Sequence, residues 1–396
     1  MHGMRMRKAT SALVGLLLAG VAATPAHADT VRSKQWHLDA MKADEIWKTS
    51  TGKGVTVAVI DTGVNRIPEL EGQVLPGAVF PVGDAEGNKD NDYFGHGTGM
   101  ASVIAGTGKH PSGDGGYGLA PGVKILPIRV PDSLEDASTP SWVEAIRYAA
   151  DSDAKVINIS QGRPGKPEDD RERAAAVKYA LSKGKLIFAA AGNDGNSINE
   201  INYPAATPGV VGIGAVGVDG KPINESQHGP QIDLAAPGDK IVTACKGKTG
   251  ICTGTGTSSA SALASASAAL IWSAHPDWTN NQVLRVLLNT AGKPTDGVER
   301  NDYVGYGVVR PRIALQTPGD PGPADVYPLP DLAAADAAKK PSASSDPKAP
   351  DAAASKPAAQ AEEKKSGSAL PWIGLGLAAC VLIGGAVTVV VVRRNR

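Results

Sequence analysis

Short apolar runs rich in β-branched residues alternate with longer segments of helical periodicity along much of the chain. The runs carry apolar side chains at both alternating positions, as buried strands do, and they are Val55–Ile60, Lys124–Val130, Lys155–Ile159, Leu186–Ala190 and Val210–Ala215. The segments with helical periodicity are Gly97–Gly106, Ser141–Asp151, Asp169–Lys183, Ser258–His275 and Thr279–Thr290. This alternation predicts an α/β fold, a doubly wound parallel sheet with helices on both faces.

The two ends of the chain carry apolar segments of another kind. Basic residues near the start precede the apolar stretch Leu13–Ala23 and the small-residue pattern at 26–28. This order is typical of a secretory signal peptide, which we expect to span residues 1–28. Near the other end, residues 369–392 are uncharged and apolar. At about 1.5 Å per residue, a helix of this length crosses a hydrocarbon core of about 30 Å. We therefore predict one transmembrane helix there.

The basic tail, residues 393–396, follows that apolar run directly. Because positively charged flanks stay in the cytoplasm, we expect a single-pass protein of the cell membrane whose globular part faces outward. Residues 318–368 are rich in Pro, Ala, Asp, Lys and Ser. Such a segment buries too little apolar surface to offset the entropy of ordering, so it predicts a disordered stalk, a flexible linker. Residues 54–317 then form one globular domain.

Charge and cysteine content narrow the function. The 40 basic and 40 acidic residues give a formal net charge of zero. Without a basic patch, nucleic acid is not an expected partner. Two of the three cysteines, Cys245 and Cys252, flank a segment that favours a hairpin turn. In an oxidising compartment this pair is expected to form a disulfide, and the alternative is two unpaired thiols.

Three segments place a chemically active side chain beside glycine at the boundary of a predicted element. Asp61 ends an apolar strand, His96 begins a helix between two glycines, and Ser258 begins a helix of small residues. Taken singly, each has an ordinary structural interpretation, such as a turn or a tight packing position. Together they supply a nucleophile, a base and an anion that orients the base, which is what acyl transfer needs. Their chain order is that of subtilisin and not that of chymotrypsin.

The motifs around these residues extend the pattern. Asp61-Thr62-Gly63, His96-Gly97-Thr98 and Gly256-Thr257-Ser258 with Ala260 resemble the three signature motifs of the subtilisin-like serine peptidases, the subtilases. The resemblance implies a catalytic triad of Asp61, His96 and Ser258. Ala190–Asn193 resembles the oxyanion loop of that family, which implies that Asn193 is the side-chain donor. Val156–Gly162 resembles the strand that lines its substrate cleft. The substrate-binding residues implied in this way are Asn158, Ser160, Gln161, Gly162, Ala191 and Gly192.

A subgroup of the family fits more closely. The single C-terminal span, the Pro/Ala-rich stalk, and Trp36 and Trp47 ahead of the catalytic strand resemble the mycosins, subtilases associated with type VII secretion. The resemblance implies protein or peptide substrates and, as partners, components of a membrane secretion complex. The stretch between Asp29 and Asp61 is too short for the folding pro-domain of secreted subtilisins. We therefore expect residues 29–53 to wrap the domain.

Two positions depart from the family pattern, and one alternative function stays open. Ala262 stands where the family usually has proline, and we expect this change to loosen the start of the nucleophile helix. Gly99 stands where many subtilases have a second histidine. The alternative function is a weakly active or inactive peptidase-like scaffold that stabilises a membrane secretion complex. A fluorophosphonate probe separates the two, because only an activated serine reacts with it.

No cofactor is expected. The segment Gly212–Gly217 satisfies the dinucleotide-binding pattern after a strand, but a turn follows it where that fold needs a helix. Calcium has one candidate, the acidic segment Asp84–Asp92, for which a solvated loop is the favoured interpretation.

Overall fold

The centre of the protein is a seven-stranded parallel sheet in the order β2-β3-β1-β4-β6-β8-β9. The computed structural model describes residues 29–80, 91–131, 139–246 and 250–338. The strands are β1 Thr56–Asp61, β2 Ala78–Val79, β3 Lys124–Arg129, β4 Val156–Ile159, β6 Leu186–Ala190, β8 Val211–Val216 and β9 Leu234–Pro237. The predicted α/β sheet is confirmed, and the predicted strands agree within one residue at each end. The edge strands β2 and β9 were not predicted, because both are too short to show a period of their own.

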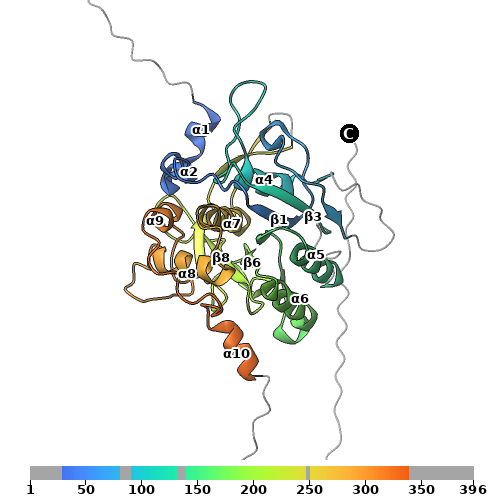
Figure 1. Cartoon of the computed structure of the whole chain (residues 1–396), viewed down its shortest axis with the longest axis vertical. Helices are drawn as coiled ribbons and strands as arrows, with labels where there is room; N and C mark the ends of the chain where they lie inside the picture. Colours follow the sequence, from blue (N-terminus) through green and yellow to red (C-terminus); the bar gives the residue numbers. More distant parts are fainter. Residues whose placement is uncertain (1–28, 81–90, 132–138, 247–249, 339–396) are drawn as a thin grey trace, which may run out of the picture. The chain divides into compact units, whose positions relative to one another are not determined.

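Helices cover both faces of this sheet (Figure 1). One face packs against α4 His96–Ala105 and α7 Thr257–Ala274, and α8 Asn280–Thr290 packs beside α7. The other face packs against α5 Thr139–Asp151 and α6 Arg171–Ser182. The Ala- and Ser-rich sequence of α7 lets it lie close to five strands, so nearly all of the helix is buried. The catalytic segments predicted above therefore belong to elements with little freedom to move.

The N-terminal segment lies against the domain through three short helices. They are α1 Val31–Lys34, α2 Trp36–Met41 and α3 Ala43–Ile46. The indole of Trp36 donates to the carbonyl of Asp239 at 2.9 Å, and the indole of Trp47 donates to the carbonyl of Leu119 at 2.9 Å. Each indole therefore joins this segment to a distant part of the domain.

Short strand pairs flank the main sheet. The hairpin of β10 Ile241–Ala244 and β11 Ile251–Gly254 is antiparallel, and a disulfide joins Cys245 to Cys252 across it. A second antiparallel pair joins β5 Arg163–Pro164 to β7 Asn202–Tyr203. Single-turn 3-10 helices are η1 Pro68–Leu70 and η2 Pro167–Asp170. The β5–β7 pair brings Asn202 to the end of the predicted substrate-binding strand.

The chain continues as ordered structure past the predicted boundary at residue 317. After α9 Pro311–Gln316, the guanidinium of Arg285 on α8 donates to the carbonyls of Pro321, Pro323 and Val326. Leu329 is buried in the core, and α10 Asp331–Ala338 follows. This part of the predicted linker is therefore packed on the domain, because its few apolar residues bury against it. These few apolar residues were not recognised, because the composition of residues 318–368 as a whole is that of a linker.

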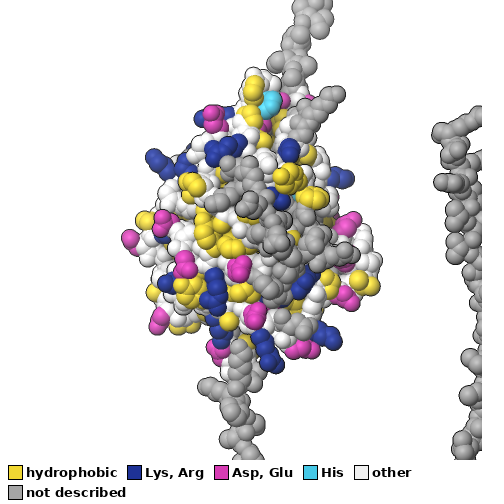
Figure 2. Space-filling view, turned by 90° about the vertical axis from the view of Figure 1, so that its right-hand side faces the viewer, with side chains coloured by type: hydrophobic (Ala, Val, Ile, Leu, Met, Phe, Trp, Pro, Cys, Tyr) yellow, Lys and Arg dark blue, Asp and Glu magenta, His cyan; other side chains and the backbone are white. Residues whose placement is uncertain are grey.

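Several predictions concern residues outside the described part of the chain. They are the signal peptide 1–28, the transmembrane helix 369–392 and most of the acidic segment 84–92. Among the described residues, no helix is both long and apolar enough to span a bilayer. On the face drawn in Figure 2, acidic and basic side chains are intermixed, in line with a net charge of zero.

Candidate active site

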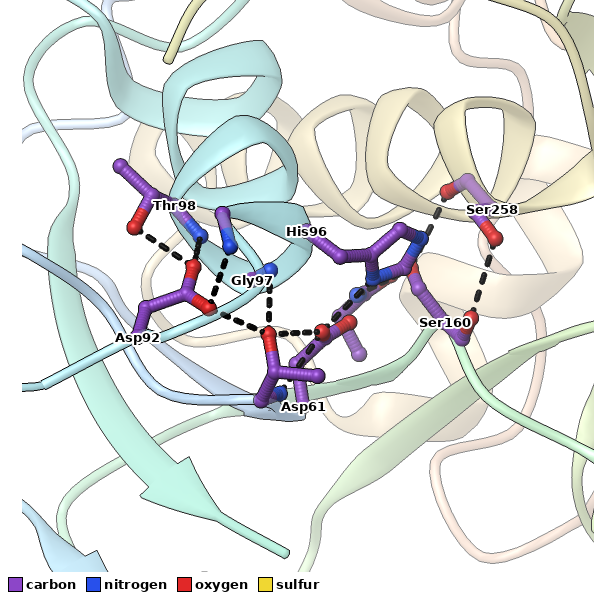
Figure 3. Close-up of polar contacts among 10 residues, drawn as sticks. Asp61, Asp92, His96, Gly97, Thr98, Ser160 and Ser258 are labelled. Carbon is purple, nitrogen blue, oxygen red and sulfur yellow. Dashed lines mark hydrogen bonds and ion pairs between the residues drawn. The ribbon is translucent and has the colours of Figure 1, made fainter. Parts of the chain in front are cut away.

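The end of β1 brings Asp61 against the first residue of α4. Asp61 is completely buried, and its Oδ1 lies 2.7 Å from Nδ1 of His96. The same oxygen accepts the backbone N–H of Thr62 at 2.8 Å. A Cβ at Gly97 would lie 2.1 Å from the carbonyl oxygen of Gly63, so only glycine lets α4 come this close to β1. The imidazole is thereby held with its other nitrogen, Nε2, directed away from Asp61 (Figure 3).

A second buried carboxylate, Asp92, supports this arrangement from the loop before α4. Its Oδ1 accepts the hydroxyl of Thr62 at 2.8 Å and the N–H of Gly95 at 2.7 Å. Its Oδ2 accepts the N–H and the hydroxyl of Thr98 at 2.8 and 2.7 Å. Asp92 therefore ties the turn after β1 to the N-terminus of α4, where a negative charge is favourable. A role for Asp92 at this site was not predicted, although a carboxylate just before a helix start is a recognisable capping signal.

The charge of His96 is controlled by these neighbours. The Asp61 carboxylate raises the pKa of the imidazole above 6.5, burial acts in the opposite direction, and Asp92 adds a further electrostatic increase. The side chain keeps 39% of its surface exposed, so it can meet a ligand from the solvent side. A neutral His96 can act as a base. A protonated His96 is stabilised electrostatically by the carboxylates of Asp61 and Asp92.

Ser258 lies in the first turn of α7, on the far side of the imidazole from Asp61 (Figure 3). Its hydroxyl donates to the carbonyl of Ser160 at 3.0 Å, and the hydroxyl of Ser160 donates to the carbonyl of Ser258 at 3.0 Å. This reciprocal pair fixes the end of β4 against the start of α7.

Asn193 faces the same space from the loop after β6. Its Oδ1 accepts the backbone N–H of Thr257 at 2.8 Å and the hydroxyl of Thr257 at 3.0 Å. The hydroxyl of Thr257 in turn accepts the N–H of Gly192 at 3.0 Å. Because Oδ1 is occupied by Thr257, the amide nitrogen Nδ2 is left to donate. The N–H of Ser258 lies in the first turn of α7, where no intrahelical carbonyl can reach it.

One cavity of about 420 Å³ unites these groups. Of the predicted residues, it is lined by His96, Ser160, Gln161, Gly162, Gly192, Asn193 and Ser258. Asp61 lies behind His96, as an orienting carboxylate should.

Two of the predicted substrate-binding residues do not line this cavity. Asn158 and Ala191 are completely buried and do not line the cavity. Side chains alternate along a strand, which turns Asn158 towards α7. There its Oδ1 accepts the hydroxyls of Ser261 and Ser265 at 3.0 and 3.1 Å. The side chain of Asn158 therefore helps to position α7.

Other lining residues were not predicted. Phe94 lies beside His96 with 72% of its surface exposed, and Pro131, Trp142 and Asn202 also line the cavity. Each comes from a segment without a motif, so the sequence carried no signal for it. Ala262, the position that departs from the family pattern, is buried within α7, which begins ahead of it at Thr257.

Comparison with known proteins agrees with this geometry. Residues 52–307 match the profile of the subtilase family, peptidase family S8, and this match covers more than half of the chain. The chain is 34% identical over 333 residues to mycosin-1 of Mycolicibacterium smegmatis, covering 71% of this chain and 72% of that protein. It is also 34% identical over 270 residues to subtilisin E of Bacillus subtilis, covering 67% of each.

Solved structures give the same result. A crystal structure of MycP1 from the ESX-1 type VII secretion system superposes with a TM-score of 0.65 and 31% identity, covering 76% of this chain and 91% of that one. MycP3 from the ESX-3 system superposes with a TM-score of 0.61 and 32% identity, covering 71% and 88%. The chain therefore belongs to the subtilase family and is a mycosin-like serine-type endopeptidase.

Proposed function

We propose that this protein cleaves peptide bonds through a triad of Asp61, His96 and Ser258 and an acyl-enzyme intermediate. The observation that carries the proposal is the placement of His96, held on one side by Asp61 at 2.7 Å and facing Ser258 on the other. His96 Nε2 takes the hydroxyl proton as Ser258 Oγ attacks the carbonyl carbon. Asp61 keeps the imidazole in the required tautomer and stabilises the cation that forms.

The negative charge that develops on the substrate oxygen needs donors that are fixed in advance. Asn193 Nδ2 and the N–H of Ser258 fill this role, because the contact of Asn193 Oδ1 with Thr257 fixes the direction of the amide. The imidazolium of His96 then protonates the leaving amine, and water releases the acyl group by the same steps. An extended substrate pairs its backbone with residues 160–162 at the cavity edge.

The cellular setting is part of the proposal. A secretory signal at 1–28 and an apolar span at 369–392 would hold the peptidase domain outside the cell on a single C-terminal anchor. The relatives MycP1 and MycP3 come from type VII secretion systems. We infer that this protein processes exported proteins of such a system at the membrane. A chain ending before residue 369 should then move from the membrane fraction to the medium.

Labelling with a fluorophosphonate probe tests the triad. The full chain should react at Ser258, and His96→Ala should abolish the labelling, because the hydroxyl loses its base. By analogy with subtilisin, Ser258→Ala should lower kcat by about 10⁶ and Asn193→Ala by about 10²–10³.

The control is Asn281→Ala, which removes an exposed hydrogen bond on α8 far from these residues in sequence and should leave labelling intact. Labelling that survives the His96 change would refute the mechanism. A chain that is never labelled, yet is required for secretion, would support the scaffold role.

A further inference from the structure

A buried amide borders the active-site cavity. Asn202 on β7 lines the cavity and is only 5% exposed. Gly162 and Gly192 lie on either side of it. A Cβ at Gly162 would lie 3.6 Å from Cβ of Asn202, and one at Gly192 would lie 2.2 Å from its Nδ2. Because both neighbours lack side chains, this part of the cavity, called the arm below, is bordered by their backbone and by the carboxamide of Asn202, which we call its floor.

This floor holds polar atoms that lack partners. Oδ1 of Asn202 is buried, and no hydrogen-bond partner for it exists among the described residues. Directly behind Gly192, the side chain of Gln227 is also completely buried, and neither end of its amide has a partner within the described part of the chain. Leaving a buried polar atom unpaired is unfavourable, because the atom loses its hydrogen bonds to water. A ligand that supplies the missing hydrogen bonds would recover this cost, whereas an apolar ligand would not.

The position of the arm identifies the part of the ligand that enters it. The arm belongs to the same cavity as residues 160–162, where the substrate backbone pairs in the proposed function, and as the loop that carries Asn193. A substrate whose carbonyl lies between Ser258 and Asn193 directs the side chain of that same residue into the arm. Asn202 therefore contacts the residue on the acyl side of the cleaved bond.

We propose that Asn202 makes this peptidase selective for a side-chain carboxamide, glutamine or asparagine, on the acyl side of the cleaved bond. The inference rests on the proposed function and names its substrate class. A carboxamide offers a donor to Oδ1 and an acceptor to Nδ2, so it pairs with Asn202 through both ends. A leucine of similar size leaves both ends unpaired, and a carboxylate meets Oδ1 with a second acceptor.

A lysine is the main competitor, because Asp194 is exposed at the rim of the cavity. The floor argues against it, since an ammonium group donates to Oδ1 but accepts nothing from Nδ2. An exposed rim carboxylate also attracts a cation only weakly through water. The floor, and not the rim, is therefore expected to decide the selectivity.

The experiment measures kcat/KM of the full-length protein in detergent on peptides that differ only in the residue before the cleaved bond. Glutamine should exceed leucine by about 10- to 100-fold, the effect of one to two buried hydrogen bonds. Asn202→Leu should reverse this order. Asn202→Ser, which fits the site without crowding, should bring the two rates within a few-fold of each other.

Glu200→Gln is the matched control, since residue 200 is exposed and close in sequence, and it should keep the wild-type order. The same peptides, used as competitors against the fluorophosphonate probe, report binding even where cleavage is slow. Preference for leucine in a labelled enzyme would overturn the inference alone. A preference for lysine that disappears in Asp194→Asn would also overturn the inference alone. Absence of both labelling and cleavage would overturn the proposed function together with the inference.

Discussion

At the scale of single residues, Asp92 shows how a side chain outside the triad controls it. It receives four hydrogen bonds from Thr62, Gly95 and Thr98. It also adds to the electrostatic increase in the pKa of His96. We regard it as a positioning residue, because it acts on the substrate only through His96.

Replacing Asp92 by Asn should shift the pH dependence of kcat/KM. The base must be neutral, so activity is lost as the pH falls through the raised pKa of His96, which lies above 6.5. Removing the Asp92 charge lowers that pKa, and the acidic limb should therefore move to lower pH. A pH–rate profile checks the shift, and thermal unfolding measured in parallel reports the loss of the cap. If the acidic limb of the profile stays at its original pH, Asp92 has only a structural role.

At the scale of elements, helix α2 carries a buried histidine with an effect on stability. His37 is completely buried, and neither ring nitrogen has a partner among the described residues. Burial, with a smaller contribution from Arg32, lowers the pKa of His37 from 6.5 to about 3. The folded protein therefore keeps the ring neutral where the unfolded chain takes up a proton.

This difference predicts loss of stability in acid. Between pH 6.5 and about 3 the unfolded state binds one more proton at His37, so the free energy of unfolding falls by about 1.4 kcal/mol per pH unit as the pH falls. His37→Phe keeps a ring without titrating and should remove that part of the slope. Urea unfolding from pH 7 to pH 4 measures it. Equal slopes in the two proteins would contradict the role of His37.

Hydrogen bonds between elements also explain how the active site is assembled. The side chain of Asn158 binds Ser261 and Ser265, and Ser160 binds Ser258, so β4 and α7 are joined by a row of hydrogen bonds. The hairpin β10–β11 contacts α4, because the hydroxyl of Thr243 on β10 donates to the carbonyl of Gly99 on α4. In the chain, the same hairpin is followed by α7. His96, the proposed base, and Ser258, the proposed nucleophile, thus depend on shared neighbouring elements.

At the scale of the whole molecule, the segment after α9 closes the domain. Leu329 is 3% exposed in the main core, although it lies in a stretch with the composition of a linker. Arg285 fixes the same stretch through three carbonyls. The domain that folds therefore includes residues beyond 317.

Leu329→Ala should destabilise the protein by about 2–5 kcal/mol, the usual effect of a large-to-small change in a core. The matched control is Val326→Ala, because Val326 is 50% exposed in the same segment and its change should cost little. Urea unfolding compares the two variants. Equal stability of both would mean that this segment is not part of the folded core.

The sequence alone determined the five inner strands of the sheet, its covering helices and the three residues of the proposed triad. Their signals are local, since apolar periodicity fixes each element and glycine-flanked motifs mark the ends where side chains converge. Asp61, His96 and Ser258 are predicted in this way, without any distance.

Only the tertiary structure decided which other residues share the cavity. The alternation of β4 turned Asn158 inward, and the pairing of β7 with β5 brought Asn202 beneath the glycines of two other loops. Likewise, the packing of Leu329 into the core showed that the folded domain continues past residue 317. These outcomes depend on contacts between segments far apart in the chain, and such contacts leave no periodic or compositional trace in the sequence.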